Sequence, residues 1–177
     1  ERSQIIAARK AYHGNTQGSL SIMDYELRKQ PFRPLLPDVA WIEFNNEAEL
    51  QKITTRTAGV VLETIQGGAG FITPENDYLA KVKQRCQEVG ALLILDEIQP
   101  GFGRTGKLFG FQNYNVVPDI IAIGKGMASG LPCGAFVASY DLMHLLADKP
   151  KMSHITTFGG NPVVAAASLA TLNELLT

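Results

Sequence analysis

Ala91-Leu-Leu-Ile-Leu-Asp96-Glu97-Ile-Gln99, followed later in the chain by Asp119-Ile-Ile-Ala-Ile-Gly-Lys125, is the part of the sequence that decides the fold. Each segment is a short apolar run that ends in charged residues. Runs this short and this rich in Ile and Leu are typical of strands buried on both faces of a parallel sheet. In open α/β sheets the ligand crevice lies outside the carboxyl ends of the strands, so we expect Asp96 and Lys125 at one rim.

The remainder of the chain alternates predicted strands with predicted helices. Strands are expected at 4–8, 40–44, 59–65, 91–97, 119–124 and 134–138. Helices are expected at 47–56 after a cap at Asn46, at 75–89 between Pro74 and Gly90, at 141–147 and at 162–176. Residues 24–39 contain three prolines and are predicted to be an extended surface excursion. This alternation predicts a three-layer α/β/α domain with a mostly parallel sheet.

The size and composition are those of an ordinary globular domain. The chain has 177 residues, of which 45% are hydrophobic and 19% charged, enough for one domain with its own core. A net charge of −1 predicts no broad attraction to nucleic acid or to an anionic membrane. No apolar run approaches the ~20 residues that span a bilayer. The chain opens without an initiator methionine and is expected to be part of a longer protein.

The cysteines and histidines argue against a redox site and against a metal site. Cys86 and Cys133 have neither redox nor metal-ligand spacing, which indicates free thiols in a reducing compartment. Because no secretory signal is visible either, a cytoplasmic protein is expected. The histidines, His13, His144 and His154, are scattered, so we expect solvated or core-satisfied side chains and no metal site.

Two nucleotide-binding patterns overlap between Gly101 and Lys107. The stretch matches G-x-G-x-x-G, but a dinucleotide site needs a helix directly after the loop, and the residues that follow start a helix poorly. It also mimics a phosphate loop, yet Leu108 stands where Ser or Thr should reach magnesium. A tight glycine-containing turn with Arg104 as a surface or interface charge is the favoured interpretation, and a nucleotide-binding domain remains the alternative.

Lys125 and Asp96 have the properties of a pair that holds pyridoxal phosphate. A lysine nucleophile needs a neutral amine, and Lys125 lies between two glycines that let a bulky cofactor approach the backbone. A buried carboxylate such as Asp96 is costly unless it pairs with a cation, and a protonated pyridine nitrogen is such a cation. The cofactor therefore offers each residue a partner, its pyridine nitrogen for the carboxylate and its aldehyde carbon for the amine.

Three more polar or aromatic residues could complete such a site. Gln99 could bind the ring hydroxyl through its amide. Thr157 precedes the helix expected from Pro162 and could bind a phosphate, although simple capping of that helix explains it equally well. Tyr12 could stack on a flat ring, although an isolated tyrosine is more often a packing residue.

The motifs resemble those of the class III aminotransferases, which depend on pyridoxal phosphate and have the fold-type I large domain. The resemblance spans nearly the whole chain, in family order. It rests on Tyr12-His13-Gly14, Glu63-Thr-Ile-Gln66-Gly67, Leu95-Asp96-Glu97-Ile98-Gln99-Pro-Gly-Phe-Gly-Arg-Thr-Gly106, Pro118-Asp119-Ile, Gly124-Lys125-Gly126 and Thr157-Phe-Gly-Gly-Asn-Pro162.

The resemblance implies a role for each matched residue. Lys125 would bond the cofactor and move protons, Asp96 would pair with the ring nitrogen, and Gln99 would contact the ring oxygen. Tyr12 and His13 would lie against the cofactor, and Glu63 would be a polar wall near the substrate. Thr157 would bind the phosphate of the neighbouring subunit, which implies a homodimer with a shared active site. Residues 1–177 would be the central part of the large domain, without the N-terminal segment and the C-terminal small domain.

The implied reaction moves an amino group from an ω-amino acid, of the acetylornithine or ornithine type, to 2-oxoglutarate. A 4-aminobutyrate-type aminotransferase, a decarboxylating relative and an aminomutase of the glutamate-1-semialdehyde type are the alternatives within the same fold. The chain departs from many relatives in having Thr64 for Pro, Gly68 for Glu and Pro100 for Thr or Ser. Gly68 leaves the exact donor open, because in the ornithine-type enzymes that Glu pairs with the arginine that receives a substrate carboxylate.

Overall fold

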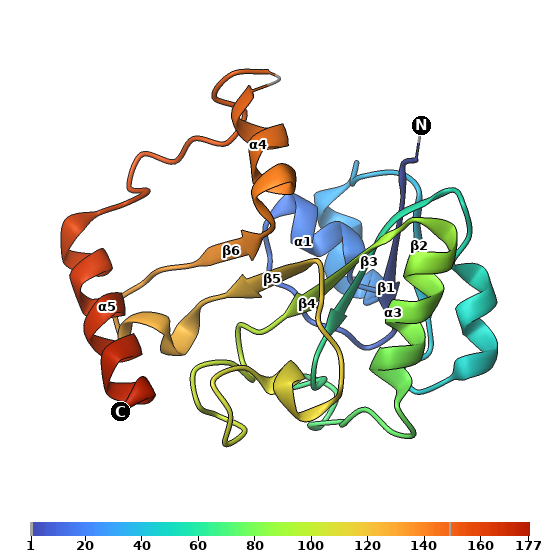
Figure 1. Ribbon diagram of the computed structural model, residues 1–177. Helices are drawn as coiled ribbons and strands as arrows, with labels where there is room; N and C mark the ends of the chain where they lie inside the picture. Colours follow the sequence, from blue (N-terminus) through green and yellow to red (C-terminus); the bar gives the residue numbers. More distant parts are fainter. Residues whose placement is uncertain (1, 149) are drawn as a thin grey trace.

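A six-stranded sheet lies at the centre of the computed structural model, which describes residues 2–148 and 150–177 (Figure 1). The spatial order of the strands is β2-β1-β3-β4-β5-β6. β1 to β5 run parallel, and β6 pairs antiparallel with β5, so the predicted mostly parallel sheet is confirmed. The strands are β1 (Gln4–Ala8), β2 (Val39–Ile42), β3 (Thr57–Glu63), β4 (Leu92–Asp96), β5 (Ile120–Ile123) and β6 (Ala135–Ala138).

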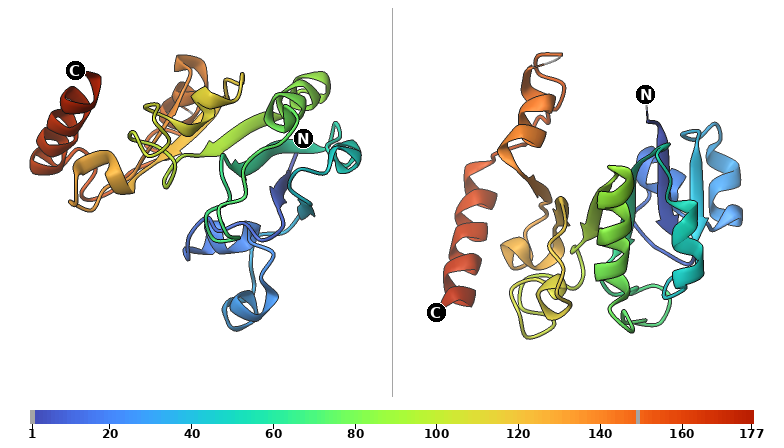
Figure 2. Two further views of the ribbon diagram at one scale, coloured as in Figure 1. Left: turned by 90° about the horizontal axis from the view of Figure 1, so that it is seen from below. Right: turned by 45° about the vertical axis from the view of Figure 1, so that its right-hand side comes forward.

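Helices cover both faces of this sheet, which confirms the predicted three layers. Helix α3 lies on one face, and the segment with α1 and α2 lies on the other (Figure 2). Helix α5 stands beyond β6 and packs against the turn η4. None of the helices in the described residues has the length and apolarity needed to cross a membrane. The α-helices are α1 (Gln17–Ile22), α2 (Glu26–Lys29), α3 (Tyr78–Val89), α4 (Tyr140–Asp148) and α5 (Pro162–Leu176); the 3-10 helices are η1 (Gln30–Phe32), η2 (Glu47–Lys52), η3 (Gly110–Asn113) and η4 (Lys125–Ala128).

Helix α3 contributes one apolar face to the main core. Its fully buried side chains recur at helical spacing and pack with the inner residues of β3 and β4. Burial of Leu79 and of Val82 stabilises the fold by roughly 1.5–3 kcal/mol each. The helix ends at Gly90, as predicted, because glycine adopts the required φ of +73° readily. It begins at Tyr78 and not at residue 75, since Asn76 and Asp77 both have positive φ.

Two predictions from local sequence were wrong in detail. Residues 24–39 are not simply extended, because they form α2 and η1. Lys29 is buried there, where its amine donates to the carbonyls of Ser21 and Met23 and lies 4.3 Å from the centre of the Trp41 ring. Burial lowers the pKa of Lys29. The expected helix at 47–56 is the shorter η2, although Asn46 caps it as predicted by accepting from the amide of Ala48.

Candidate active site

The parallel strands bring the candidate residues to one rim. Glu63 ends β3 and Asp96 ends β4, and the two are paired in register. Lys125 follows the neighbouring strand β5, and Tyr12 lies four residues beyond the last residue of β1. Strand order reverses between β1 and β3, because the chain continues from β1 to β2 on one side and from β3 to β4 on the other. A crevice at such a point is where ligands of open α/β sheets bind.

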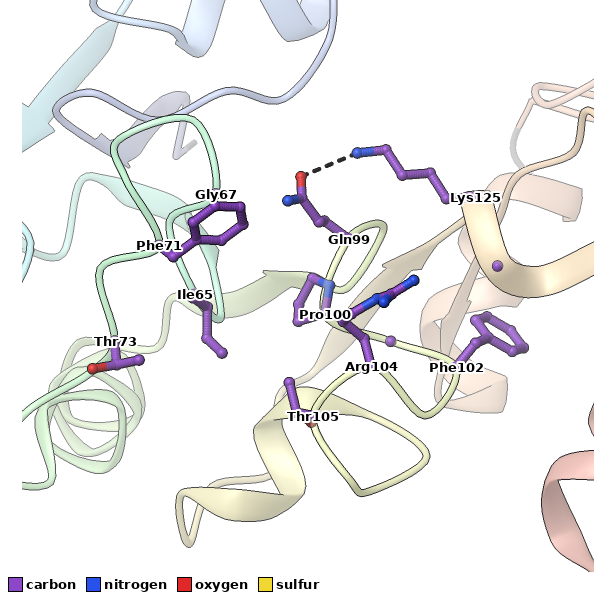
Figure 3. Close-up of a pocket in the computed structure, with 12 residues that line it drawn as sticks. Ile65, Gly67, Phe71, Thr73, Gln99, Pro100, Phe102, Arg104, Thr105 and Lys125 are labelled. Atoms are coloured by element: carbon purple, nitrogen blue, oxygen red, sulfur yellow. Dashed lines mark hydrogen bonds between the residues drawn. The ribbon is translucent and has the colours of Figure 1, made fainter. Parts of the chain in front are cut away.

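The rim holds a small cavity that opens beside a larger cleft. The cavity, of about 110 Å³, is lined by Tyr12, His13, Gly14, Glu63, Asp96, Ile98, Gln99, Pro100 and Lys125. The cleft, of about 660 Å³, shares Gln99, Pro100 and Lys125 with it (Figure 3). The cavity thus gathers all the expected site residues except Thr157.

Asp96 is a buried carboxylate held in place by two donors. Its Oδ2 lies 2.8 Å from Nδ1 of His13, and its Oδ1 accepts from the amide of Ile98 at 3.0 Å. The side chains of His13 and Asp96 are only 4% and 9% exposed. A proton on Nδ1 lets the imidazole donate to this carboxylate, and the contact orients the ring. His13 is therefore core-satisfied on one side, whereas its Nε2 is buried without a partner in the described residues.

Lys125 faces Gln99 across the mouth of the cavity. The amine Nζ lies 3.1 Å from the amide oxygen Oε1 of Gln99, and Figure 3 shows the two side chains pointing toward each other. Lys125 has a left-handed φ of +40°, which is uncommon for a residue with a Cβ. Backbone outliers of this kind cluster at ligand-binding sites. Gly124 before it has extended backbone, with φ −176°, and η4 begins at Lys125.

Glu63 binds the backbone of two loops. Its Oε2 accepts from the amide of Tyr12 at 3.0 Å, and its Oε1 accepts from the amide of Gly67 at 3.1 Å. Burial raises the pKa of Glu63, while these two amides and the nearby His13 act in the opposite direction. The carboxyl thus fixes the loop that carries Tyr12 beside the cavity.

The arrangement fits pyridoxal phosphate. An acid stands at the floor of the cavity, and a lysine amine with an amide oxygen beside it stands at the mouth. On the cofactor, the aldehyde and the ring hydroxyl sit on neighbouring ring carbons, and the nitrogen sits opposite the aldehyde. The unpartnered Nε2 of His13 is a further polar atom for a ligand in this cavity. The part of the chain that the structure describes contains no group of three His, Cys, Asp or Glu side chains that could hold a metal.

Thr157 is not brought to this cavity. It lies on the exposed segment 151–160 before α5 and lines neither the cavity nor the cleft. The cap of α5 is Asn161, whose Oδ1 accepts from the amides of Val163 and Val164. Thr157 is therefore free of the capping role that the sequence left open, and its assignment to a phosphate stays a prediction.

The loop 98–109 supplies cleft residues to which the sequence assigned no role in the site. Phe102, Arg104 and Thr105 line the cleft on one side, and Phe71 and Thr73 line it on the other. The signal that could have found the first three is their position directly after Gln99, within the glycine-containing stretch. That stretch leads only into the four-residue η3, so the helix that a dinucleotide-binding loop requires does not follow it.

Comparison with known proteins gives concordant results. The profile of the family described as aminotransferase class-III matches residues 1–177. The chain is 45% identical over 180 residues to the putrescine aminotransferase of Pectobacterium atrosepticum. This alignment covers 97% of the present chain and 38% of the relative. It is 41% identical over 177 residues to the acetylornithine aminotransferase of Oceanobacillus iheyensis. This second alignment covers 99% of the present chain and 44% of the relative.

Solved structures agree with these sequence matches. The ornithine aminotransferase of Toxoplasma gondii, whose structure reveals partial occupancy of pyridoxal phosphate at the active site, has a TM-score of 0.92 to this chain at 30% identity. The match covers 99% of this chain and 41% of that one. The chain spans less than half the length of the curated relatives it matches.

Proposed function

This chain belongs to the aminotransferase class-III family, and on that premise we propose that it forms the central part of the large domain of a pyridoxal-phosphate-dependent aminotransferase. The observation that carries the proposal is that Asp96, Gln99 and Lys125 line one small cavity at the switch point of the sheet. The free cysteines Cys86 and Cys133 suit a cytoplasmic enzyme.

Pyridoxal phosphate, when bound, supplies an aldehyde that accepts the amino group and a ring that draws electrons from the bond being broken. The residues of this chain supply the rest. The carboxylate of Asp96, oriented by His13, would hold a proton on the ring nitrogen. Nζ of Lys125 would take and return the proton at the substrate carbon, and the amide of Gln99 would orient the ring oxygen beside it. Tyr12, fixed by Glu63, would cover one face of the ring.

For the substrates, we propose an ω-amino acid of the acetylornithine or ornithine type as donor and 2-oxoglutarate as acceptor. The likeness to acetylornithine and ornithine aminotransferases supports this donor. A diamine is the second candidate, because the relative at 45% identity is a putrescine aminotransferase. Rates with acetylornithine, ornithine and putrescine, each with 2-oxoglutarate, distinguish the two. An aminomutase would instead isomerise its substrate with no 2-oxo acid present.

Borohydride reduction tests the cofactor assignment directly. Reduction of the protein loaded with pyridoxal phosphate should fix the cofactor to one peptide, and mass spectrometry should place it on Lys125. Lys125→Ala should lose the label and the yellow colour. Lys107→Ala, an exposed lysine of the glycine-containing loop, is the matched control and should keep both. Labelling at another lysine defeats the assignment, and tight binding of ATP or NAD without a coloured cofactor would favour the nucleotide-binding alternative.

A further inference from the structure

Glu97 is a fully buried carboxyl that does not face the cavity. It follows Asp96 directly, but it lines neither the cavity nor the cleft. Burial raises its pKa, and three hydrogen bonds to its carboxyl act in the opposite direction. A buried carboxyl is costly without such partners, so its position calls for a reason beyond packing.

The three donors to Glu97 come from two distant parts of the chain. Its Oε1 accepts from the hydroxyl of Thr64 at 2.5 Å and from the amide of Phe111 at 2.8 Å. Its Oε2 accepts from the amide of Gly110 at 2.7 Å. Thr64 directly follows β3, whereas Gly110 and Phe111 begin η3. The carboxyl therefore joins the end of the sheet to the far end of the loop that starts beside it.

The near end of the same loop packs closely against the backbone of Glu97. The amide of Gly101 donates to the carbonyl of Glu97 at 3.0 Å, and a Cβ at position 101 would lie 2.6 Å from that oxygen. At the far end, a Cβ on Gly110 would lie 2.9 Å from Cβ of Pro100. Contacts this close leave no room for any side chain at either glycine. Both ends of residues 98–109 thus meet at Glu97.

These residues form one wall of the site. They contribute Ile98, Gln99, Pro100, Gly101, Phe102, Arg104 and Thr105 to the cavity or the cleft. Among them, Gln99 makes the 3.1 Å contact with Lys125. A shift of the loop ends would therefore move the residue that faces the reactive lysine.

We propose that Glu97 is a positioning residue: its carboxyl, oriented by Thr64, holds the far end of loop 98–109 close to the near end, which the backbone carbonyl of Glu97 binds, and so sets the place of Gln99 and the width of the cleft. This clamp is a property of the fold, while its effect on pyridoxal phosphate rests on the function proposed above. Thr64 locks the carboxyl in the orientation that serves both backbone amides, since its hydroxyl shares Oε1 with Phe111.

Thr64→Val and Thr64→Ser form a matched pair that tests the clamp in the protein at its natural length. Valine keeps the shape and removes the donor, whereas serine keeps the hydroxyl. We expect Thr64→Val to speed amide hydrogen exchange at Gly110 and Phe111 about fivefold to tenfold, the effect of one typical hydrogen bond. It should also weaken pyridoxal phosphate binding, measured by absorbance titration of the apoprotein, by a factor of about three or more. Thr64→Ser should stay within about twofold of wild type in both measurements.

The outcomes separate the clamp from a purely stabilising role. If Thr64→Val lowers the melting temperature while exchange in 98–113 and cofactor affinity match those of Thr64→Ser, the proposal is overturned. Faster loop exchange with unchanged cofactor affinity also overturns the positioning role. Glu97→Gln is the stronger variant, because its amide would place N–H groups against the amide of Gly110, and it should exceed Thr64→Val in both effects. If the wild-type protein shows no borohydride label on Lys125, the proposed function fails. Amide hydrogen exchange at Gly110 and Phe111 then still tests whether Glu97 and Thr64 hold the loop.

Discussion

Oδ2 of Asp96 lies 2.8 Å from Nδ1 of His13, although the two residues are far apart in the sequence. Both side chains are almost fully buried, so the contact is not loosened by water. The imidazole therefore orients the carboxylate that we assign to the ring nitrogen. Two variants of His13 separate this orienting bond from the rest of the imidazole.

His13→Leu should weaken pyridoxal phosphate binding by a factor of roughly ten to a hundred, because a hydrogen bond to a buried charged group contributes about 1.5–3 kcal/mol. His13→Asn should lose much less, since its amide N–H reaches nearly the same place as Nδ1. Absorbance titration of the apoproteins measures both affinities, and His154→Asn at an exposed site is the control. Equal losses in His13→Leu and His13→Asn would show that the bond to Asp96 is not the source.

A methyl group at Gly67 should disturb the site without unfolding the protein. Its Cβ would lie 2.8 Å from the amide nitrogen and oxygen of Gln99, the far end of a flexible side chain that can move away. We expect Gly67→Ala to break the contact between Gln99 and Lys125 and to reduce turnover about tenfold, with a stability change below about 1 kcal/mol. Gly18→Ala, where a Cβ meets no neighbour within 4 Å, is the matched control. Wild-type turnover in Gly67→Ala would contradict the role given to Gln99.

Much of this site is predictable from local sequence because the parallel sheet places the residues that follow its strands at one edge. Asp96 and Lys125 end or follow apolar runs, and carboxyl ends of parallel strands meet at one edge, so their proximity follows from the strands alone. The bond between His13 and Asp96 was not predictable in this way, since it depends on how the loop after β1 turns back over the rim. The same holds for the donors to Glu97, and for Lys29, whose partners are backbone carbonyls that no side-chain pattern reveals.

Glu63 should give the protein a characteristic dependence of stability on pH. Because burial raises its pKa above the ordinary value of 4.5, the folded protein holds this proton more tightly than the unfolded chain. The resulting stabilisation is present at low pH and is lost as the pH rises from about 4.5 through the raised pKa. Glu63→Gln cannot lose a proton there, so the free energy of unfolding of wild type minus that of the variant should fall across this window. Urea unfolding at several pH values measures it.

The exposed Glu75 provides the control for that experiment. Glu75→Gln should leave the difference from wild type nearly constant with pH. A difference for Glu63→Gln that rises with pH would mean that the amides of Tyr12 and Gly67 stabilise the carboxylate more than burial disfavours it. The direction of the slope therefore decides which of the two effects is larger.

Mixed subunits test whether Thr157 serves a neighbouring active site, as the homodimer implied by the family resemblance requires. Lys125→Ala and Thr157→Ala should each be nearly inactive alone. In a mixed dimer with the shared arrangement, one site receives both defects, whereas the other combines an intact Lys125 from one subunit with an intact Thr157 from its partner. Co-expression with two different affinity tags should therefore restore up to about half of wild-type activity per dimer. If Thr157 acted within its own subunit, each site would keep one defect and no activity would return. Its exposed position outside the cavity that holds Lys125 favours the first outcome.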